Sequence, residues 1–283
     1  MREIAIISGK GGTGKTTLAL SIIPYFKELV IADCDVDAPD MKILLSQKQT
    51  EKNLFYGLQI PTFDYDRCID CKLCHQSCAF NAISESIELI PGKCEGCNFC
   101  EYLCPVNAIT MENHAIGHLN KHQTAYGPMV DAKLFPGQES SGKLVSEVRD
   151  KAIELAKDTH RETIIIDGSP GVACNVISTI TGVDEVLVVT EPTMSGIHDL
   201  KRVIDLIKIF NIPIHVIVNK ATINEAKTEE IKEYCQENNL KVLLEIPFDQ
   251  TIVNDISRKV IPSLGESTFF KSKDWKAFVK HLI

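Results

Sequence analysis

A glycine-rich loop near the start of the chain restricts the possible folds more than any other feature. Residues 9–16 read Gly-Lys-Gly-Gly-Thr-Gly-Lys-Thr, which satisfies the pattern G-x-x-x-x-G-K-[ST]. The loop follows an apolar segment, Ile4 to Ile7, and precedes a helical segment, Thr16 to Ile23. A second apolar segment, Val30 to Asp33, comes next. This order predicts a βαβ unit that carries a phosphate-binding loop.

Each residue type in the loop suits a nucleoside triphosphate. Glycines let successive backbone N–H groups face the phosphates, and the N-terminus of the following helix adds partial positive charge. Lys15 is expected to reach the β and γ phosphates, and the Thr16 hydroxyl to bind Mg²⁺. The alternative is a glycine-rich turn without a ligand. The predicted nucleotide-binding residues of this loop are Gly9, Lys10, Gly11, Gly12, Thr13, Gly14, Lys15, Thr16 and Thr17.

Apolar segments alternate with amphipathic ones in the second half of the chain. Nearly continuous apolar strands separated by helices are typical of a parallel sheet covered on both faces. The predicted fold class is therefore α/β, with a doubly wound, mostly parallel sheet. The expected strands are 163–167, 185–190, 214–219 and 243–247, and the expected helices are 143–158, 196–210, 225–237 and 269–283.

Eight of the eleven cysteines lie between Asp64 and Met111. Residues 68–83 and 94–109 match at each cysteine and at a closing Asn-Ala-Ile, so this region is an internal repeat. Each half has the spacing C-x-x-C-x-x-C-x-x-x-C of bacterial two-cluster ferredoxins, in which the fourth cysteine ligates the other half's cluster. Zinc is the alternative, although the third and fourth cysteines do not follow a four-ligand zinc arrangement. The spacing predicts two [4Fe-4S] clusters, one on Cys68, Cys71, Cys74 and Cys104 and one on Cys94, Cys97, Cys100 and Cys78.

The cysteine-rich segment is interpreted as an insertion, because the α/β alternation resumes beyond it. Residues 1–60 and 113–283 are assigned to the α/β domain, and residues 61–112 to a small inserted α+β domain of the bacterial ferredoxin type. Residues 113–141, which are rich in Gly, Pro, His and Ser, are expected to form a long loop.

Three histidines in that segment, His114, His118 and His122, recur every four residues. Such spacing would place them on one helix face as metal ligands. Gly117 interrupts the pattern, and the loop-like composition disfavours this alternative.

Lys10 distinguishes the phosphate loop from the general pattern. The run from Lys10 to Thr17 resembles the deviant Walker A loop of the MinD, ParA and nitrogenase iron protein group. In that group the corresponding lysine reaches the phosphates of a partner in a nucleotide-sandwiched dimer. The resemblance therefore implies an ATP-dependent homodimer; the alternative for Lys10 is a solvated surface lysine.

Two acidic segments match the same group in order. Residues 33–37, Asp-Cys-Asp-Val-Asp, resemble switch I, where Asp35 is the expected carboxylate that orients the attacking water or holds the metal shell. Residues 167–171, Asp-Gly-Ser-Pro-Gly, resemble Walker B with switch II, so Asp167 is expected to hold Mg²⁺ through water. An acidic turn capped by its own side chains is the alternative for the first segment. The resemblance implies that Lys10, Lys15, Asp35 and Asp167 are catalytic.

Three further features of the chain have possible counterparts in this group. Asn219 ends a predicted strand and resembles the adenine-recognition position, with its amide contacting the base edge. Cys174 lies about where the nitrogenase iron protein carries a ligand to a bridging cluster; its second ligand has no counterpart, and a buried thiol is preferred. The C-terminal apolar face around Trp275 could act as a MinD-like membrane tail, but packing on the sheet is expected.

Charge and hydropathy limit the possible partners. The net charge of −8 disfavours a protein that holds nucleic acid by phosphate neutralisation. No apolar run approaches the roughly 18 residues of a spanning helix, and no signal peptide is evident, so a cytoplasmic protein is expected. The leading hypothesis is an ATPase whose nucleotide-dependent dimerisation drives metallocluster assembly or delivery to a client. The alternatives are ATP-gated electron transfer to a redox partner and a MinD/ParA-like spatial organiser.

Overall fold

The computed structural model describes residues 1–138 and 142–283, and the chain divides into two compact units. The first unit contains Met1–Lys52, Leu119–Lys133 and the chain from helix α4 (Gly142–Asp158) to the C-terminus. The second unit contains Asn53–His118 and the residues that follow Lys133. Each unit has its own hydrophobic cluster.

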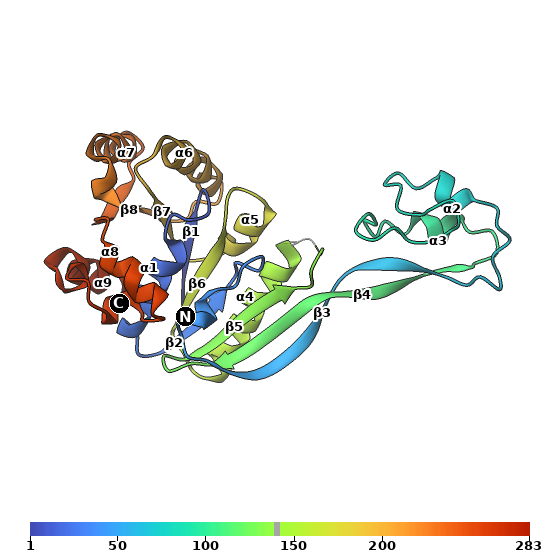
Figure 1. The fold of residues 1–283 in the computed structure, drawn as a ribbon, viewed down its shortest axis with the longest axis horizontal. Helices are drawn as coiled ribbons and strands as arrows, with labels where there is room; N and C mark the ends of the chain where they lie inside the picture. The colour runs from blue at the N-terminus through green and yellow to red at the C-terminus, as the bar shows by residue number, and fades with distance from the viewer. Residues whose placement is uncertain (139–141) are drawn as a thin grey trace. The chain divides into compact units, whose positions relative to one another are not determined.

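Two long strands belong to both units. Strand β3 (Lys48–Phe63) begins in the first unit and ends in the second, and β4 (Ile109–Gln123) returns the chain to the first (Figure 1). The domain boundaries expected after residues 60 and 112 fall inside these strands.

Within the part of the chain that the structure describes, nine strands form one sheet in the order β3-β4-β5-β2-β6-β1-β7-β8-β9. Every pair from β5–β2 to β8–β9 is parallel. The mostly parallel α/β sheet predicted from the sequence is confirmed. The remaining strands are β1 (Arg2–Ser8), β2 (Leu29–Asp33), β5 (Pro128–Leu134), β6 (Thr163–Pro170), β7 (Glu185–Thr190), β8 (Ile214–Asn219) and β9 (Lys241–Ile246).

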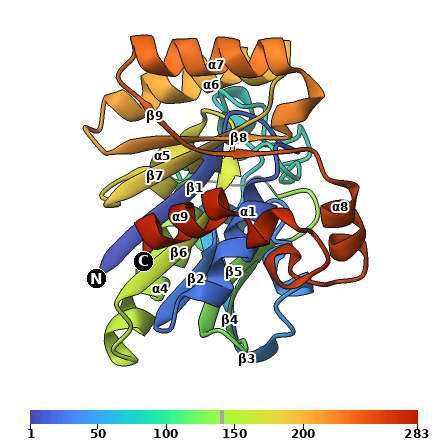
Figure 2. The same cartoon turned by 90° about the vertical axis from the view of Figure 1, so that its left-hand side faces the viewer.

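Helices cover both faces of the parallel strands. Alternate strand residues such as Ile6 and Ile31 join one cluster with α1 (Lys15–Ile22) and α9 (Lys273–Leu282), which lie across the same face (Figure 2). The intervening residues, such as Ile7, are also fully buried. These intervening residues lie on the opposite face of the sheet, and α4, α5 and α6 also contact the strands. The other helices are α5 (Cys174–Ile180), α6 (Met194–Lys208), α7 (Glu225–Glu237) and α8 (Gln250–Ser257).

The C-terminal helix packs on the sheet, as expected. Trp275 is fully buried, its ring centroid lies 4.7 Å from that of Phe270, and its indole N–H donates to the Tyr25 hydroxyl at 3.1 Å. No helix within residues 1–138 and 142–283 is long and apolar enough to cross a membrane.

The long loop expected over residues 113–141 is wrong for most of that segment. Residues up to Gln123 belong to β4, and β5 follows after a turn in which the Thr124 N–H donates to the carbonyl of Gly127 at 3.0 Å. Residues 139–141 lie outside the described residues. The pattern was misleading because this strand pair buries polar side chains, which hydrogen-bond to one another instead of forming an apolar stripe.

His114, His118 and His122 lie on β4 and not on a helix, so they cannot form the helical metal site that was considered. His122 is buried, and its Nε2 lies 2.7 Å from Asp131 Oδ2 on β5. Asn120 donates to the other oxygen of Asp131 at 2.7 Å, and the Lys42 ammonium lies 3.3 Å from this carboxylate. Asp131 thus connects β4, β5 and the segment after β2.

Candidate nucleotide site and cysteine cavities

The phosphate loop joins the end of β1 to the start of α1, as the sequence predicts. Gly14 has φ of 96°, and a Cβ at this position would lie 2.1 Å from Asn219 Nδ2, so only glycine fits. The same amide nitrogen donates to the carbonyl of Thr13 at 2.7 Å, and the Lys220 ammonium donates to the carbonyl of Gly12 at 3.0 Å. The end of β8 therefore holds the loop in shape.

The two predicted magnesium ligands, Thr16 and Asp167, meet Lys15 beneath this loop. The Thr16 hydroxyl donates to Asp167 Oδ2 at 2.6 Å, and Lys15 Nζ lies 2.7 Å from Asp167 Oδ1. The side chains of Lys15 and Asp167 are 6% and 1% exposed. Burial opposes the charge of Lys15, but the carboxylates of Asp167 and Asp35 outweigh it and raise its pKa. This arrangement is suited to bind Mg²⁺ beside the terminal phosphates of a nucleotide.

The two aspartates nearest the start of switch I have different environments. Asp33 is fully buried and accepts hydrogen bonds from the N–H groups of Asp35 and Met41, each at 3.2 Å. Burial, with the nearby charge of Asp167, raises the pKa of Asp33 well above its usual value. Asp35 is partly exposed, and its carboxylate lies 3.5 Å from Lys15 Nζ. Asp33 therefore holds the backbone of the segment that follows β2, whereas Asp35 reaches Lys15.

Hydrogen bonds connect the segment that resembles switch I to the segment that resembles switch II. The N–H of Cys34 donates to the carbonyl of Asp167 at 2.7 Å, and the Ser169 hydroxyl donates to the carbonyl of Cys34 at 2.8 Å. Further along, the N–H of Gly171 donates to the carbonyl of Ser8 at 2.8 Å. Both segments and the start of the phosphate loop are therefore joined by hydrogen bonds.

Two hollows flank the phosphate loop. One, of about 630 Å³, is lined by the loop together with Asp35, Asp37 and Ser169, and is suited to phosphates and a hydrated metal. The other, of about 150 Å³, is more apolar and includes Asn219, Phe248 and other residues of the segment after β9. A base could lie there. Asn219 was predicted from its place at a strand end, whereas the segment after β9 was not, because it carries no recognisable motif.

Lys10 contacts residues of its own chain. Its ammonium lies 2.7 Å from Glu191 Oε1 and 2.8 Å from the Ser195 hydroxyl. Lys220 lies 2.8 Å from the other oxygen of Glu191. Burial acts to raise the pKa of Glu191, but hydrogen bonds from the two lysines lower it overall. Glu191 directly follows β7 and was not predicted as a site residue. Its position at the carboxyl end of a predicted parallel strand could have indicated one, because ligands bind at that end of such sheets.

The eight repeat cysteines line two cavities in the second unit. One cavity is lined by the quartet Cys68, Cys71, Cys74 and Cys104. The other, of about 280 Å³, is lined by the quartet Cys78, Cys94, Cys97 and Cys100, together with Cys74. These are the two ligand sets expected from the spacing, in which each half of the repeat lends its fourth cysteine to the other.

The repeat extends to the backbone. Lys72 and Asn98, at equivalent positions, have φ of 61° and 64° and precede the short helices α2 (Leu73–Gln76) and α3 (Phe99–Leu103). The N–H of Ala82 donates to Cys78 Sγ at 3.3 Å, and that of Ala108 to Cys104 Sγ at 3.1 Å. Such N–H donors stabilise negative charge on sulfur ligands of iron.

At least four cysteine sulfurs around each cavity form a donor set that fits an iron–sulfur cluster. Burial raises the pKa of Cys100 to about 11 and also raises the pKa of Cys74, which favours the neutral thiol where no metal is bound. A thiol in such a place loses its proton when a metal ion binds it.

Outside the repeat, Cys34 and Cys235 are buried but Cys174 is exposed. The expectation of a buried thiol at Cys174 is therefore wrong. Cys174 begins α5, whose buried residues are Val176, Thr179 and Ile180. The helical period leaves the first residue on the solvent side.

The chain resembles known proteins over nearly its whole length. The family model for the CobQ/CobB/MinD/ParA nucleotide binding domain matches residues 4–262. An uncharacterized protein of Methanocaldococcus jannaschii, MJ0578, is 35% identical over 92% of this chain and 89% of its own length. The septum site-determining protein MinD of Thermotoga maritima is 24% identical over 88% of this chain and 76% of that protein. MinD of Pyrococcus horikoshii in complex with Mg-ADP has a similar fold, with a TM-score of 0.55 and 18% identity over 99% of this chain and 93% of the other.

Proposed function

This chain belongs to the CobQ/CobB/MinD/ParA nucleotide-binding family, and we propose that its ATP cycle controls electron transfer to a partner protein by two [4Fe-4S] clusters that it holds itself. Members of the MinD/ParA group are P-loop ATPases, and this chain is an ATP-binding ATPase of that type. The observation that carries the proposal is the division of the repeat cysteines into two quartets, each lining one cavity.

The number of ligands favours electron transfer over release of a cluster. A [4Fe-4S] cluster is held by four cysteine thiolates, and it exchanges electrons at a potential that the surrounding protein sets. One cavity is lined by four cysteines and the other by five, so each offers at least the four sulfurs of a complete ligand set. Release of a cluster would require an acceptor to replace all four thiolates. Cys71 and Cys97 are exposed, so a partner could approach each cluster from solvent.

The nucleotide would act through residues around the phosphate loop. Lys15, Thr16 and Asp167 would hold the terminal phosphates and Mg²⁺, while Asp35 would orient the attacking water. Lys10 would leave Glu191 to reach the nucleotide of a second copy, forming an ATP-dependent homodimer. Loss of the γ phosphate would shift Ser169, whose hydroxyl donates a hydrogen bond to the carbonyl of Cys34 and so joins the two switch segments.

Two other functions remain candidates. Metallocluster assembly or delivery is supported by the exposure of Cys71 and Cys97, which would let an acceptor's ligands reach the iron. A spatial organiser is supported by the similarity to MinD of Thermotoga maritima, a septum site-determining protein. That role would need no iron.

The decisive experiment measures iron and its response to nucleotide on anaerobically purified full-length chain. About eight iron atoms per chain are expected, with reduced-state EPR spectra and potentials that shift when MgATP is added. Lys15→Ala provides the control, since its spectra should not respond. Iron that moves to an apo-ferredoxin acceptor on ATP addition, with potentials unchanged, would favour delivery. A protein without stoichiometric iron would overturn both iron-dependent functions and leave the organiser.

A further inference from the structure

Three side chains with metal-ligand chemistry gather in the first unit, away from the phosphate loop. Glu185 is the first residue of β7, His215 lies at the start of β8, and His281 is in the last turn of α9. The phosphate loop follows the carboxyl end of β1, whereas this group lies where β7 and β8 begin. Because these strands are parallel, the phosphate loop and the three side chains lie at opposite ends of the strands.

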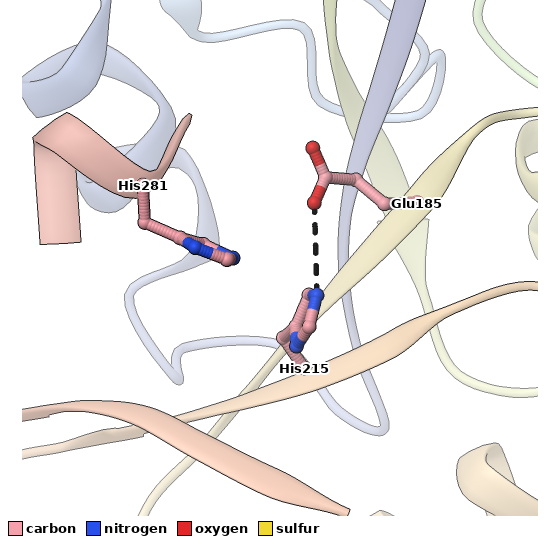
Figure 3. Close-up of side chains that lie close together, drawn as sticks. All are labelled: Glu185, His215 and His281. Carbon is pink, nitrogen blue, oxygen red and sulfur yellow. Dashed lines mark ion pairs between the residues drawn. The ribbon is translucent and has the colours of Figure 1, made fainter. Parts of the chain in front are cut away.

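The donor atoms lie at separations that one metal ion could bridge. One ligand atom from each of the three side chains falls within 4.8 Å of the others. His215 Nε2 is 3.7 Å from Glu185 Oε2, too long for a hydrogen bond. Zinc bonds of about 2.0–2.2 Å would place tetrahedral ligands roughly 3.3–3.6 Å apart. Figure 3 shows the His281 ring pointing to the gap between the Glu185 carboxylate and the His215 ring.

Neighbouring contacts orient the group as outer-shell partners do in metal sites. Arg2 binds Glu185 Oε1 and the carbonyl of Leu282, which leaves Oε2 facing His215 and fixes the chain beside His281. The Glu185 and His215 side chains are only 7% and 19% exposed. His215 Nδ1 is buried and has no hydrogen-bond partner among the described residues.

We propose that Glu185, His215 and His281 bind one divalent transition-metal ion, with zinc the best match. Two imidazoles and one carboxylate are an established zinc donor set, and the remaining position would hold water. The ion would be separate from Mg²⁺ at the phosphate loop and from iron at the cysteines. Because the three ligands come from two strands and the C-terminal helix, the ion would join α9 to the start of the sheet.

Zinc titration of the cluster-loaded full-length chain, without nucleotide, tests the site. His281 is exposed, so His281→Ala removes one ligand without emptying the core. We expect zinc affinity to fall by at least about tenfold. The matched control is His160→Asn, which removes an exposed histidine elsewhere and keeps a residue that tolerates the positive φ of 52° there. The control should bind zinc as the wild type does.

Two further readouts distinguish this site from zinc on the cysteines. The zinc K-edge spectrum of the wild type should contain nitrogen and oxygen neighbours only. Zinc should also raise the thermal midpoint reported by Trp275 fluorescence in the wild type, but not in His281→Ala. Sulfur scattering at about 2.3 Å, or equal zinc affinity in wild type and His281→Ala, would overturn the proposal.

Discussion

The ammonium of Lys10 lies 2.7 Å from the carboxylate of Glu191 in the same chain. In the proposed dimer this lysine would instead contact the nucleotide of the partner. Lys10 cannot make both contacts at once. The free energy of the ion pair with Glu191 must therefore be given up when the dimer forms. Both side chains are partly exposed, at 27% and 13%, which limits that free energy to about 1 kcal/mol.

Glu191→Gln should therefore favour the dimer. Without the ion pair, dimerisation should require roughly fivefold less ATP, the equivalent of about 1 kcal/mol. Lys10→Ala should abolish ATP-dependent dimerisation while leaving the monomer folded. Analytical ultracentrifugation over a range of MgATP concentrations measures both effects.

Glu191 also pairs with Lys220, so Lys220→Ala is the matched control for the glutamine variant. If Lys220→Ala promotes dimerisation as strongly as Glu191→Gln, the effect comes from loosening the phosphate loop and not from releasing Lys10.

Lys15→Ala should abolish ATP hydrolysis and leave iron unchanged. The lysine contacts Asp167 in the first unit, whereas the cysteine cavities belong to the second. Loss of a buried group that stabilises developing charge costs roughly 10²–10³-fold in rate. Steady-state phosphate release and iron per chain check the two halves of the prediction. Loss of iron in this variant would refute independent units.

Cys104→Ser and Cys78→Ser should each damage the cluster of the opposite half of the repeat. Cys104 lines the cavity of Cys68, Cys71 and Cys74, so its replacement should lower the iron content from about eight to about four atoms per chain. Mössbauer spectra of the two variants should show different surviving clusters.

Cys174→Ser, which alters an exposed cysteine outside the repeat, is the control for these variants and should keep all the iron. Identical surviving spectra in the Cys104 and Cys78 variants would contradict the crossed ligand sets.

Asp131→Asn should destabilise the first unit in a pH-dependent way. Burial alone would raise the pKa of Asp131, but hydrogen bonds from His122 and Asn120 lower it below its usual value. Such a carboxylate stabilises the fold above the unfolded-state pKa, and this contribution disappears as pH falls through the folded-state pKa. The variant should lose about 2 kcal/mol of unfolding free energy at neutral pH.

The difference between wild type and Asp131→Asn should stay constant down to about pH 5 and shrink below about pH 4. Urea unfolding followed by fluorescence of Trp275, the single tryptophan, reports on the first unit. A difference that grows towards acid pH would show that the folded-state pKa of Asp131 is raised instead.

Local patterns were enough for the elements that carry the nucleotide site. Strands β7 and β8 and helix α7 have the predicted bounds, because an apolar strand or an amphipathic helix repeats its signal over several residues. The phosphate loop was found because backbone geometry requires glycine at fixed spacing. The two cysteine quartets were predicted because three cysteines of each recur at short, fixed intervals, and the other half of the repeat supplies the fourth.

Features that depend on residues far apart in the chain could not be predicted from local patterns. β4 and β5 looked like a loop because His122 and Asn120 are polar; only their pairing with Asp131 makes their burial favourable. Glu191 meets Lys10 at the carboxyl end of β7, and His281 approaches Glu185 and His215 at its amino end, because the fold brings segments together that are distant in the chain. The nucleotide loop, the parallel sheet and the spacing of the cysteines all follow from local patterns in the chain. Contacts between distant residues leave no period in a sequence, so only the folded chain determined the rest.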